Sequence, residues 1–297
     1  MAVFAVLFVT AGLFFAYVYQ PGAFMTALTV PSDLKSATFV TTTRTATILH
    51  RLSGFSFTKE ALPGILISAD ERSPHSARVV LDAKGNYTLT VDGKNVYATT
   101  SPLAGVSVSP DGAKVAFAHG TTPLLPREMP QLIPSTSYDS RGWEVTVLSL
   151  ATGAKVAVGK GSAPFFIDDT HLLHFAPGAL FITDLQAQKH SFTLPGVFNR
   201  APVSVLQSPD RTLVGWMNTV TKTITIYRTS PVGVEIVATV PYVGRGPYAL
   251  GNDGLYSAHV SPLGGGVWKQ GFTDKKPRQA GFLSSSYLIT RIITGSL

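Results

Sequence analysis

A short pattern recurs four times along this chain of 297 residues: an apolar segment, a turn that carries an aspartate, and a second apolar segment. The four copies are VSVSPDGAKVAFAHG at 106–120, FFIDDTHLLHFAPG at 165–178, VLQSPDRTLVGWMN at 205–218 and ALGNDGLYSAHVSP at 249–262. The aspartates that align are Asp111, Asp169, Asp210 and Asp253, at spacings of 58, 41 and 43 residues. Because four-stranded propeller blades repeat about every 40–45 residues, the spacing predicts a ring of small sheets.

The segments between these turns are rich in β-branched and aromatic residues, as in AKVAFAH at 113–119 and KTITIYR at 222–228. Runs of this kind, bounded by Gly, Pro, Asp or Asn, are typical of strands. Beyond residue 33 no amphipathic stretch of ten residues has the spacing of a helix. We therefore predict an all-β fold with blades at 64–100, 104–160, 163–195, 202–241 and 246–281.

Strand-like segments remain at both ends of the chain, near 44–51 and 54–60 and within 284–296. Neither pair can bury both of its faces alone. One closing blade built from two strands of each terminus would solve this and leave no long open edge. The sequence thus predicts a six-bladed β-propeller, with five or seven blades as alternatives.

The best-preserved turn reads Ser109, Pro110, Asp111 and Gly112. Proline fixes φ at the second position, and glycine readily adopts the left-handed conformation that ends the turn. Later copies keep Ser208, Pro209 and Asp210, and then Asp253 and Gly254. We assign these residues structural roles in their turns.

The segment VSVSPDGAKVAFA at 106–118 is similar to the repeat of TolB-like, WD40-like (PD40) β-propellers, whose blades carry a Ser-Pro-Asp-Gly turn between the first two strands. The resemblance covers about 64–281, and only 109–112 matches the motif completely. It implies a propeller fold and an extracytoplasmic location. Such repeats occur in binding modules and beside enzymes alike, so they assign no catalytic group.

The N-terminus is strongly apolar: Ala2 to Tyr19 contains no charged side chain. Eighteen residues of helix extend about 27 Å, close to the roughly 30 Å of a bilayer core. Residues 1–32 are therefore predicted to be a membrane anchor and linker, and residues 33–297 the propeller. A cleaved signal peptide and a buried helix are the alternatives. Lys35 and Arg44 follow the segment and favour a cytoplasmic propeller, whereas the family resemblance favours an outward-facing one.

Chemistry-bearing motifs are scarce. Without cysteine there is no disulfide, thiolate nucleophile or Cys-ligated zinc. His171 and His174 lie beside Asp168 and Asp169, but residues three apart on a strand point to opposite faces. The other histidines, His50, His75, His119, His190 and His259, are scattered. Hydrolase, metalloprotease and nucleotide-binding motifs are missing, so we predict no cofactor, no metal and no catalytic residues.

A Pro-rich insertion at 120–142 interrupts the second blade. Segments of this length without structure of their own are often functional or disordered. As a hypothesis, Arg127, Tyr138 and Arg141 contact a protein partner from one face of the ring. A mobile decoration is the alternative.

The chain carries a net charge of +7 with a pI of about 9.6. Its basic residues are spread out, without the clustering that nucleic-acid binding requires, so nucleic acid is not an expected partner. The sequence predicts a single-pass membrane protein whose propeller binds or scaffolds an envelope protein or an anionic wall polymer without catalysis. A propeller hydrolase or lyase acting on an envelope glycan or small molecule is the alternative, and an interaction module facing the cytoplasm is a third possibility.

Overall fold

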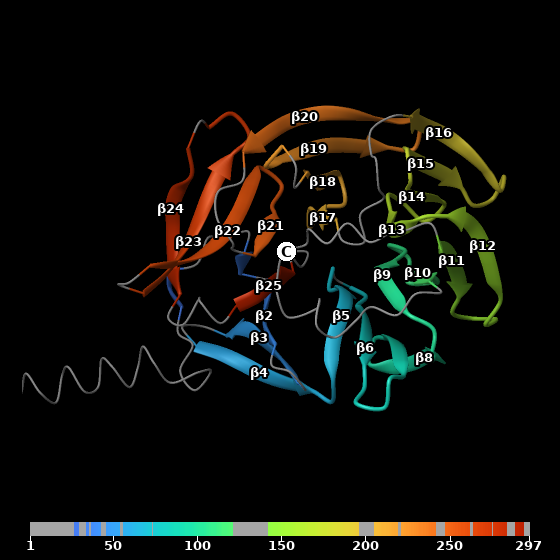
Figure 1. Ribbon diagram of the computed structural model, residues 1–297, viewed down its shortest axis with the longest axis horizontal. Coiled ribbons are helices and arrows are strands. Elements are labelled where there is room, and N and C mark those ends of the chain that lie inside the picture. The colour runs from blue at the N-terminus through green and yellow to red at the C-terminus, as the bar shows by residue number, and fades with distance from the viewer. Residues whose placement is uncertain are drawn as a thin grey trace, which may run out of the picture.

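The computed structural model describes residues 27–29, 34–35, 37–42, 46–53, 56–72, 74–120, 142–195, 205–218, 221–241, 247–261, 264–274, 276–283 and 289–293. Within these residues, antiparallel strands form six sheets. The sheets stand around a common centre as the blades of a propeller (Figure 1). The prediction of six blades is confirmed, and the alternatives of five and seven are wrong.

Five blades are formed by strands that are consecutive in the chain. Blade 1 contains β5 (Ile65–Asp70), β6 (Ala77–Leu81), β7 (Tyr87–Val91) and β8 (Lys94–Thr99). Blade 2 contains β9 (Leu103–Val108), β10 (Lys114–Gly120), β11 (Trp143–Ser149) and β12 (Lys155–Lys160). Blade 3 contains β13 (Ser162–Phe166), β14 (His171–Ala176), β15 (Ala179–Asp184) and β16 (Lys189–Pro195). In each of them the first strand lies nearest the ring centre (Figure 1).

The next two blades follow the same order. Blade 4 contains β17 (Leu206–Gln207), β18 (Leu213–Asn218), β19 (Thr223–Ser230) and β20 (Gly233–Pro241). Blade 5 contains β21 (Tyr248–Leu250), β22 (Gly254–Ser261), β23 (Gly264–Gly271) and β24 (Arg278–Leu283). All five blades begin and end within a few residues of their predicted limits. The strand signal succeeds here because antiparallel hairpins connect segments that are neighbours in the sequence.

The closing blade, blade 6, has the order β25 (Ile289–Ile293), β2 (Thr38–Thr42), β3 (Thr47–Ser53) and β4 (Ser56–Leu62). It therefore combines one C-terminal strand with three N-terminal strands, which corrects the predicted division of two and two. The division was wrong because β2 is short and pairs with a strand at the other end of the chain. Phe39 of β2 lies opposite Ile292 of β25, and both side chains are buried.

Side chains that alternate along the strands pack between neighbouring blades. Tyr87, Leu89 and Val91 of β7 are buried, and the residues between them are less so, as the period of two in a strand requires. Leu89 belongs to a buried cluster with Val106 and Phe117 of blade 2. Every residue of the inner strand β13 is buried, whereas most of the outer strand β16 is exposed. The apolar content is thus divided among the seams between blades.

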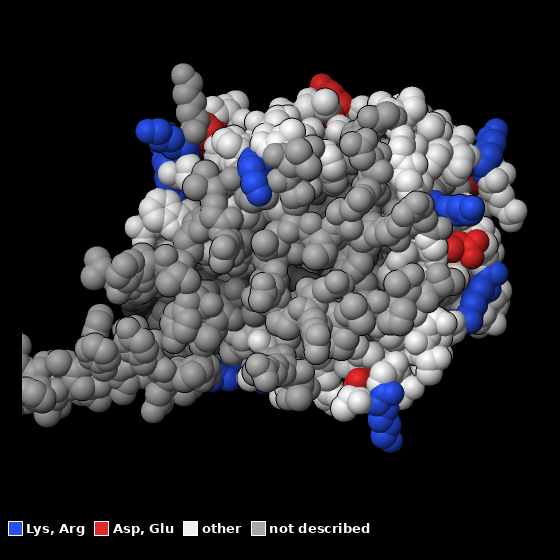
Figure 2. Space-filling model, viewed as in Figure 1, with Lys and Arg blue, Asp and Glu red and all other residues white. Residues whose placement is uncertain are grey.

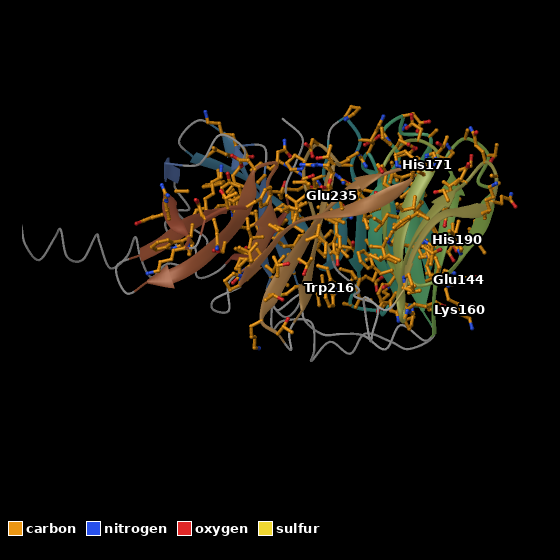
Figure 3. All side chains as sticks on the ribbon, turned by 90° about the horizontal axis from the view of Figure 1, so that it is seen from above. Glu144, Lys160, His171, His190, Trp216 and Glu235 are labelled. Carbon is orange, nitrogen blue, oxygen red and sulfur yellow. The ribbon has the colours of Figure 1, made fainter. Side chains whose placement is uncertain are left out.

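The two faces of the ring differ in the connections that form them. In blades 1–5, the turns between the first and second strands and between the third and fourth strands lie on one face, here called the turn face. The turns between the second and third strands lie on the opposite face, because adjacent strands are antiparallel. His171 and Glu235 lie toward the turn face in Figure 3, and Glu144, Lys160 and Trp216 toward the opposite face.

The N-terminal part of the chain contributes to the propeller earlier than predicted. Strand β1 (Ala27–Thr29) pairs with β24 and extends blade 5 to five strands. Leu34 is fully buried in a cluster with Tyr256 and Val267 of blade 5. The predicted apolar helix at 2–19, and most of the predicted anchor at 1–32, lie outside the described residues. Within the described part of the chain, no helix is long and apolar enough to cross a membrane.

Charge is distributed thinly over the face seen in Figure 2. The Lys and Arg side chains visible there stand singly around the rim, interspersed with Asp and Glu. The positive charge on the described part of that face is therefore diffuse.

Candidate functional site

A buried ion pair lies where the inner strand of blade 1 ends. Asp70 is the last residue of β5, and its side chain is fully buried. Arg72 follows it and is 2% exposed. The guanidinium donates from Nε to Asp70 Oδ1 and from Nη2 to Oδ2, each at 2.6 Å. This bidentate geometry is the strongest pairing available to a carboxylate and an arginine.

Blades 2 and 3 complete the surroundings of this pair. The backbone N–H of Val108 donates to Asp70 Oδ2 at 2.9 Å, and the hydroxyl of Ser107 donates to the same atom at 3.3 Å. The Arg72 guanidinium lies over the ring of Phe165 in β13, 4.8 Å from its centroid. Burial would raise the pKa of Asp70, but the charge and hydrogen bonds of Arg72, with smaller contributions from Arg211 and Val108, hold it below the usual value. The carboxylate is therefore ionised, and the ion pair joins three blades.

Arg211 reaches the same cluster from blade 4. Its Nη1 donates to the carbonyl oxygen of Val108 at 2.9 Å and lies 3.9 Å from Asp70 Oδ2. Burial, together with the positive charge of Arg72, lowers the pKa of Arg211 to about 10. The residue has a φ of 65° and occupies the position that Gly112 occupies in blade 2. An arginine at the left-handed position of the repeat thus links blade 4 to blade 2 past the inner edge of blade 3.

Within the cluster, Nη1 of Arg72 is buried and has no hydrogen-bond partner among the described residues. The group is closed to solvent, because Asp70 and Arg72 are both almost completely buried. The cluster therefore acts as an internal clamp between blades, and its described residues leave no open position for a substrate.

The predicted turn residues lie on the turn face, in the connections between first and second strands. Ser109 Oγ donates to Asp111 Oδ1 at 2.5 Å, and the N–H of Gly112 donates to the Ser109 carbonyl at 2.9 Å. Gly112 has a φ of 68°, and a Cβ there would lie 2.2 Å from the imidazole of His75. This turn therefore accepts only glycine without displacing a side chain.

The copy of this turn in blade 4 has the same hydrogen bonds. Ser208 Oγ donates to Asp210 Oδ1 at 2.6 Å, and Pro209 is buried. In blade 5, Asp253 pairs instead with Lys269 at 2.7 Å, and Gly254 begins β22. The turns thus share a position in the fold while their side chains differ in the contacts they make.

The histidines near residue 170 are separated by their strand. Asp168 accepts from the backbone N–H of His171 at 2.7 Å and lies 2.9 Å from its Nδ1. His174 is instead buried in the blade, where its ring stacks on Phe181. Among the described residues, no three His, Cys, Asp or Glu side chains are grouped so that they could hold a metal ion.

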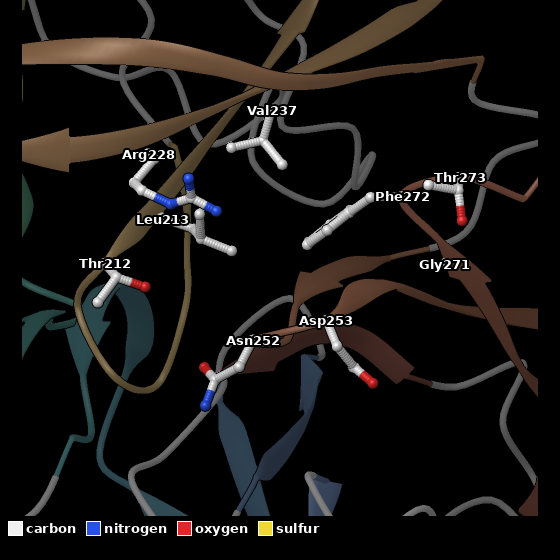
Figure 4. A pocket seen from close by; sticks show the side chains of 9 residues that line it. All are labelled: Thr212, Leu213, Arg228, Val237, Asn252, Asp253, Gly271, Phe272 and Thr273. Carbon is white, nitrogen blue, oxygen red and sulfur yellow. The ribbon is translucent and has the colours of Figure 1, made fainter.

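An open pocket lies on the turn face between blades 4 and 5 (Figure 4). Its volume is about 370 Å³, within the range of ligand sites. Blade 4 lines it with Thr212, Leu213, Arg228 and Val237, and blade 5 with Asn252, Asp253, Gly271, Phe272 and Thr273. The guanidinium of Arg228 and the ring of Phe272 point toward each other across the gap (Figure 4). Of the predicted turn residues, Asp253 lies directly in this pocket.

Sequence reasoning missed most of the residues that these two sites bring together. Arg127, Tyr138 and Arg141, which were predicted to bind a partner, lie outside the described residues. Asp70 and Arg72 could have been noticed as two charges directly after an apolar strand. Arg211 carried a clearer signal, because an arginine replaces the glycine of the repeated turn. No sequence signal marked the pocket, since its residues come from several segments of two blades, up to 61 positions apart.

No model of a known protein family and no curated protein matches this sequence. Among solved structures, the chain is similar to TolB from Acinetobacter baumannii, with a TM-score of 0.54 and 12% identity over 90% of this chain and 68% of that one. It is also similar to a chain of a nidogen/laminin complex, with a TM-score of 0.52 and 9% identity over 86% of this chain and 97% of that one. These likenesses show the fold alone: the chain is a β-propeller.

Proposed function

We propose that this chain is a non-catalytic binding module, a β-propeller that holds a protein or ligand partner at the cell envelope. The observation that carries the proposal is that the charged cluster at the ring centre is buried, with its carboxylate paired internally. Asp70 is ionised, buried and bound by Arg72, Ser107 and a backbone N–H. A catalytic acid or base needs a pKa near the working pH and contact with the substrate. Asp70 has neither property. This supports a structural role for the charged cluster at the ring centre and a binding role for the two faces of the propeller.

The alternative of a hydrolase or lyase requires several carboxylates or histidines converging at one mouth of the ring. In the described part of the chain, the inner cluster pairs Asp70 with two arginines. A carboxylate matched in this way stabilises the fold and is a poor nucleophile or proton acceptor. The arrangement therefore favours binding over glycan or small-molecule chemistry.

A protein is the partner that we propose first. A similar propeller chain occurs in a complex of nidogen with laminin, which supports protein recognition by this architecture. The insertion at 120–142, with Arg127, Tyr138 and Arg141, is proposed as one contact region. The net charge of +7 supports an anionic wall polymer as a second binding surface.

Location belongs to the same proposal. Residues 1–32 are proposed to anchor the chain in the membrane with the propeller facing outward, which rests on the apolar run at 2–19 and the family resemblance. Protease treatment of intact cells should then degrade the propeller, whereas a cytoplasmic propeller would be cleaved only after lysis.

Affinity capture of the full chain from membranes tests the binding proposal. We expect one envelope protein to be enriched specifically and to remain bound after mild cross-linking and washing. Deletion of 121–140 should reduce its recovery without loss of folding if the insertion takes part. Unchanged recovery would remove the insertion from the proposal. Absence of any specific protein or polymer, together with turnover of an envelope glycan by the purified chain, would overturn the binding module itself.

A further inference from the structure

The pocket between blades 4 and 5 has an apolar floor that is open to solvent. Leu213 is buried beneath it, while Val237 and Phe272 are each only half-buried. Phe272 lies in the turn between β23 and β24 and presents its ring to the gap (Figure 4). Half-exposed apolar side chains in a concave site gain free energy when a ligand removes them from water.

The charges at the pocket differ in how firmly they are paired. Asp253 accepts from Lys269 Nζ at 2.7 Å, in a shorter pair whose side chains are 66% and 30% exposed. The nearest carboxylate to Arg228 is Glu235, at 3.4 Å, and the two side chains are 60% and 74% exposed. Because a pair this exposed is weak, the Arg228 guanidinium can exchange it for a carboxylate that binds bidentately. The Arg228 side of the pocket is therefore complementary to an anionic group beside an apolar one.

The polar edge of the pocket is held in place before any ligand arrives. Asn252 accepts from the backbone N–H of Asp210 at 3.4 Å, which links the turns of the two blades. The turn that carries Phe272 is braced by Asp274, which accepts from the backbone N–H of Gly271 at 3.3 Å. Gln270 donates to the carbonyl of Asp274 at 3.0 Å. Such pre-organisation lowers the entropy that binding would cost.

We propose that the pocket between blades 4 and 5 binds a short peptide segment that carries a carboxylate next to a large apolar side chain. The apolar side chain lies between the Arg228 guanidinium and the Phe272 ring, and the carboxylate pairs with Arg228. The lining turns leave the pocket open at the surface, which suits a segment of a protein. This inference deepens the proposed function and rests on it, because it names the chemistry that one surface of the binding module recognises.

Ligand-observed NMR on the full chain in detergent micelles tests the proposal with four probes. These are the capped peptides Asp-Phe-Asp, Lys-Phe-Lys and Asp-Gly-Asp, and free 3-phenylpropionate. We expect Asp-Phe-Asp to bind with a Kd on the order of 1 mM and the other peptides about tenfold more weakly. Added NaCl should weaken the Asp-Phe-Asp complex, since the ion pair is solvent-exposed.

Two variants test the residues themselves. Arg228→Glu and Phe272→Ala should each weaken Asp-Phe-Asp about tenfold, whereas Lys94→Glu, an exposed change on blade 1, should leave its affinity unchanged. Thermal denaturation confirms that each variant is folded. Equal affinity for the acidic and basic peptides, or full affinity in Arg228→Glu, would overturn the proposal. Binding of 3-phenylpropionate as tight as that of the peptide would identify a small-molecule site instead.

Membrane capture with the same variants separates this inference from the proposed function. Loss of the captured protein in Arg228→Glu and Phe272→Ala supports both. A partner captured equally well by the two variants leaves the binding module intact and rejects this pocket as its contact.

Discussion

At the scale of single residues, the buried charges at the ring centre have the largest energetic consequence. Replacing Asp70 with Ala would leave Arg72 and Arg211 in the interior without their shared carboxylate. Breaking a buried pair in this way typically costs about 3–5 kcal/mol. We expect urea denaturation to show a loss of that size. The matched change of Asp184, a partly exposed aspartate at the end of β15, to Ala should have a much smaller effect, and equal losses would show that the clamp is not stabilising.

His174 predicts a dependence of stability on pH. Burial, with a smaller contribution from the charge of His190, lowers its pKa to about 3, while an unfolded histidine titrates near about 6.5. Between these values the unfolded chain binds a proton that the folded chain does not, so stability falls as pH falls below about 6.5. At pH 5 the loss is on the order of 2 kcal/mol.

His174→Phe tests this assignment, because phenylalanine can keep the stacking on Phe181 without titrating. The free energy of unfolding should fall less steeply between pH 7 and pH 5 in the variant than in the unchanged chain. His50, whose pKa burial lowers to about 4 with help from the charge of Lys59, should continue to contribute. An unchanged slope would remove His174 as a source of the pH dependence.

At the scale of elements, the sequence predicts what is local and misses what is distant. The hairpins of blades 1–5 were located because each strand is followed closely by its partner. Strand β2 was overlooked since its pairing with β25 joins the two ends of the chain. The pocket and the clamp were overlooked for the same reason: Arg211 meets Val108 across 103 positions of sequence.

Charged side chains bind the closing blade to blade 1. Arg51 of β3 pairs with Glu60 at 2.8 Å and with Glu71, after β5, at 3.0 Å. Arg78 of β6 pairs with Glu60 at 2.6 Å and also contacts Glu71. These four side chains connect blade 6 to blade 1, while β25 closes the ring through its pairing with β2.

Removal of β25 is expected to open the ring. A chain ending at residue 288 loses the buried Ile292 and Ile293 and exposes the edge of β2. We expect thermal denaturation to become broad and to occur at least about 10 °C lower, since each lost kcal/mol shifts Tm by roughly 2–4 °C in a domain of this size. A chain ending at residue 293, which keeps β25, is the control. Identical melting of the two chains would contradict closure by β25.

At the scale of the whole molecule, the first described residues of the chain join the propeller at blade 5. Strand β1 pairs with β24, and Leu34 is buried against the same blade. The folded unit therefore includes residues 27–29, before the predicted boundary at residue 33. Only seven residues separate Tyr19 from Ala27, so the two residues lie at most about 29 Å apart when the chain is extended. An anchor at 2–19 would thus hold blade 5 close to the membrane surface.

Two N-terminal deletions separate anchoring from folding. A chain beginning at residue 27 keeps β1 and Leu34, so we expect it to melt as the full chain does while leaving the membrane fraction for the soluble one. A chain beginning at residue 38 loses β1 at the outer edge of blade 5 and loses Leu34 and Ala37, which are buried between blades 5 and 6. Removing buried leucine contacts of this kind costs about 2–5 kcal/mol, so this chain should melt at a lower temperature. Fractionation with a carbonate wash, followed by thermal denaturation, measures both effects.

The chain from residue 27 should not stay with the membranes if the apolar run is the anchor. If it does stay, the propeller itself binds them. The source of membrane association is then the diffuse positive charge and not the apolar run.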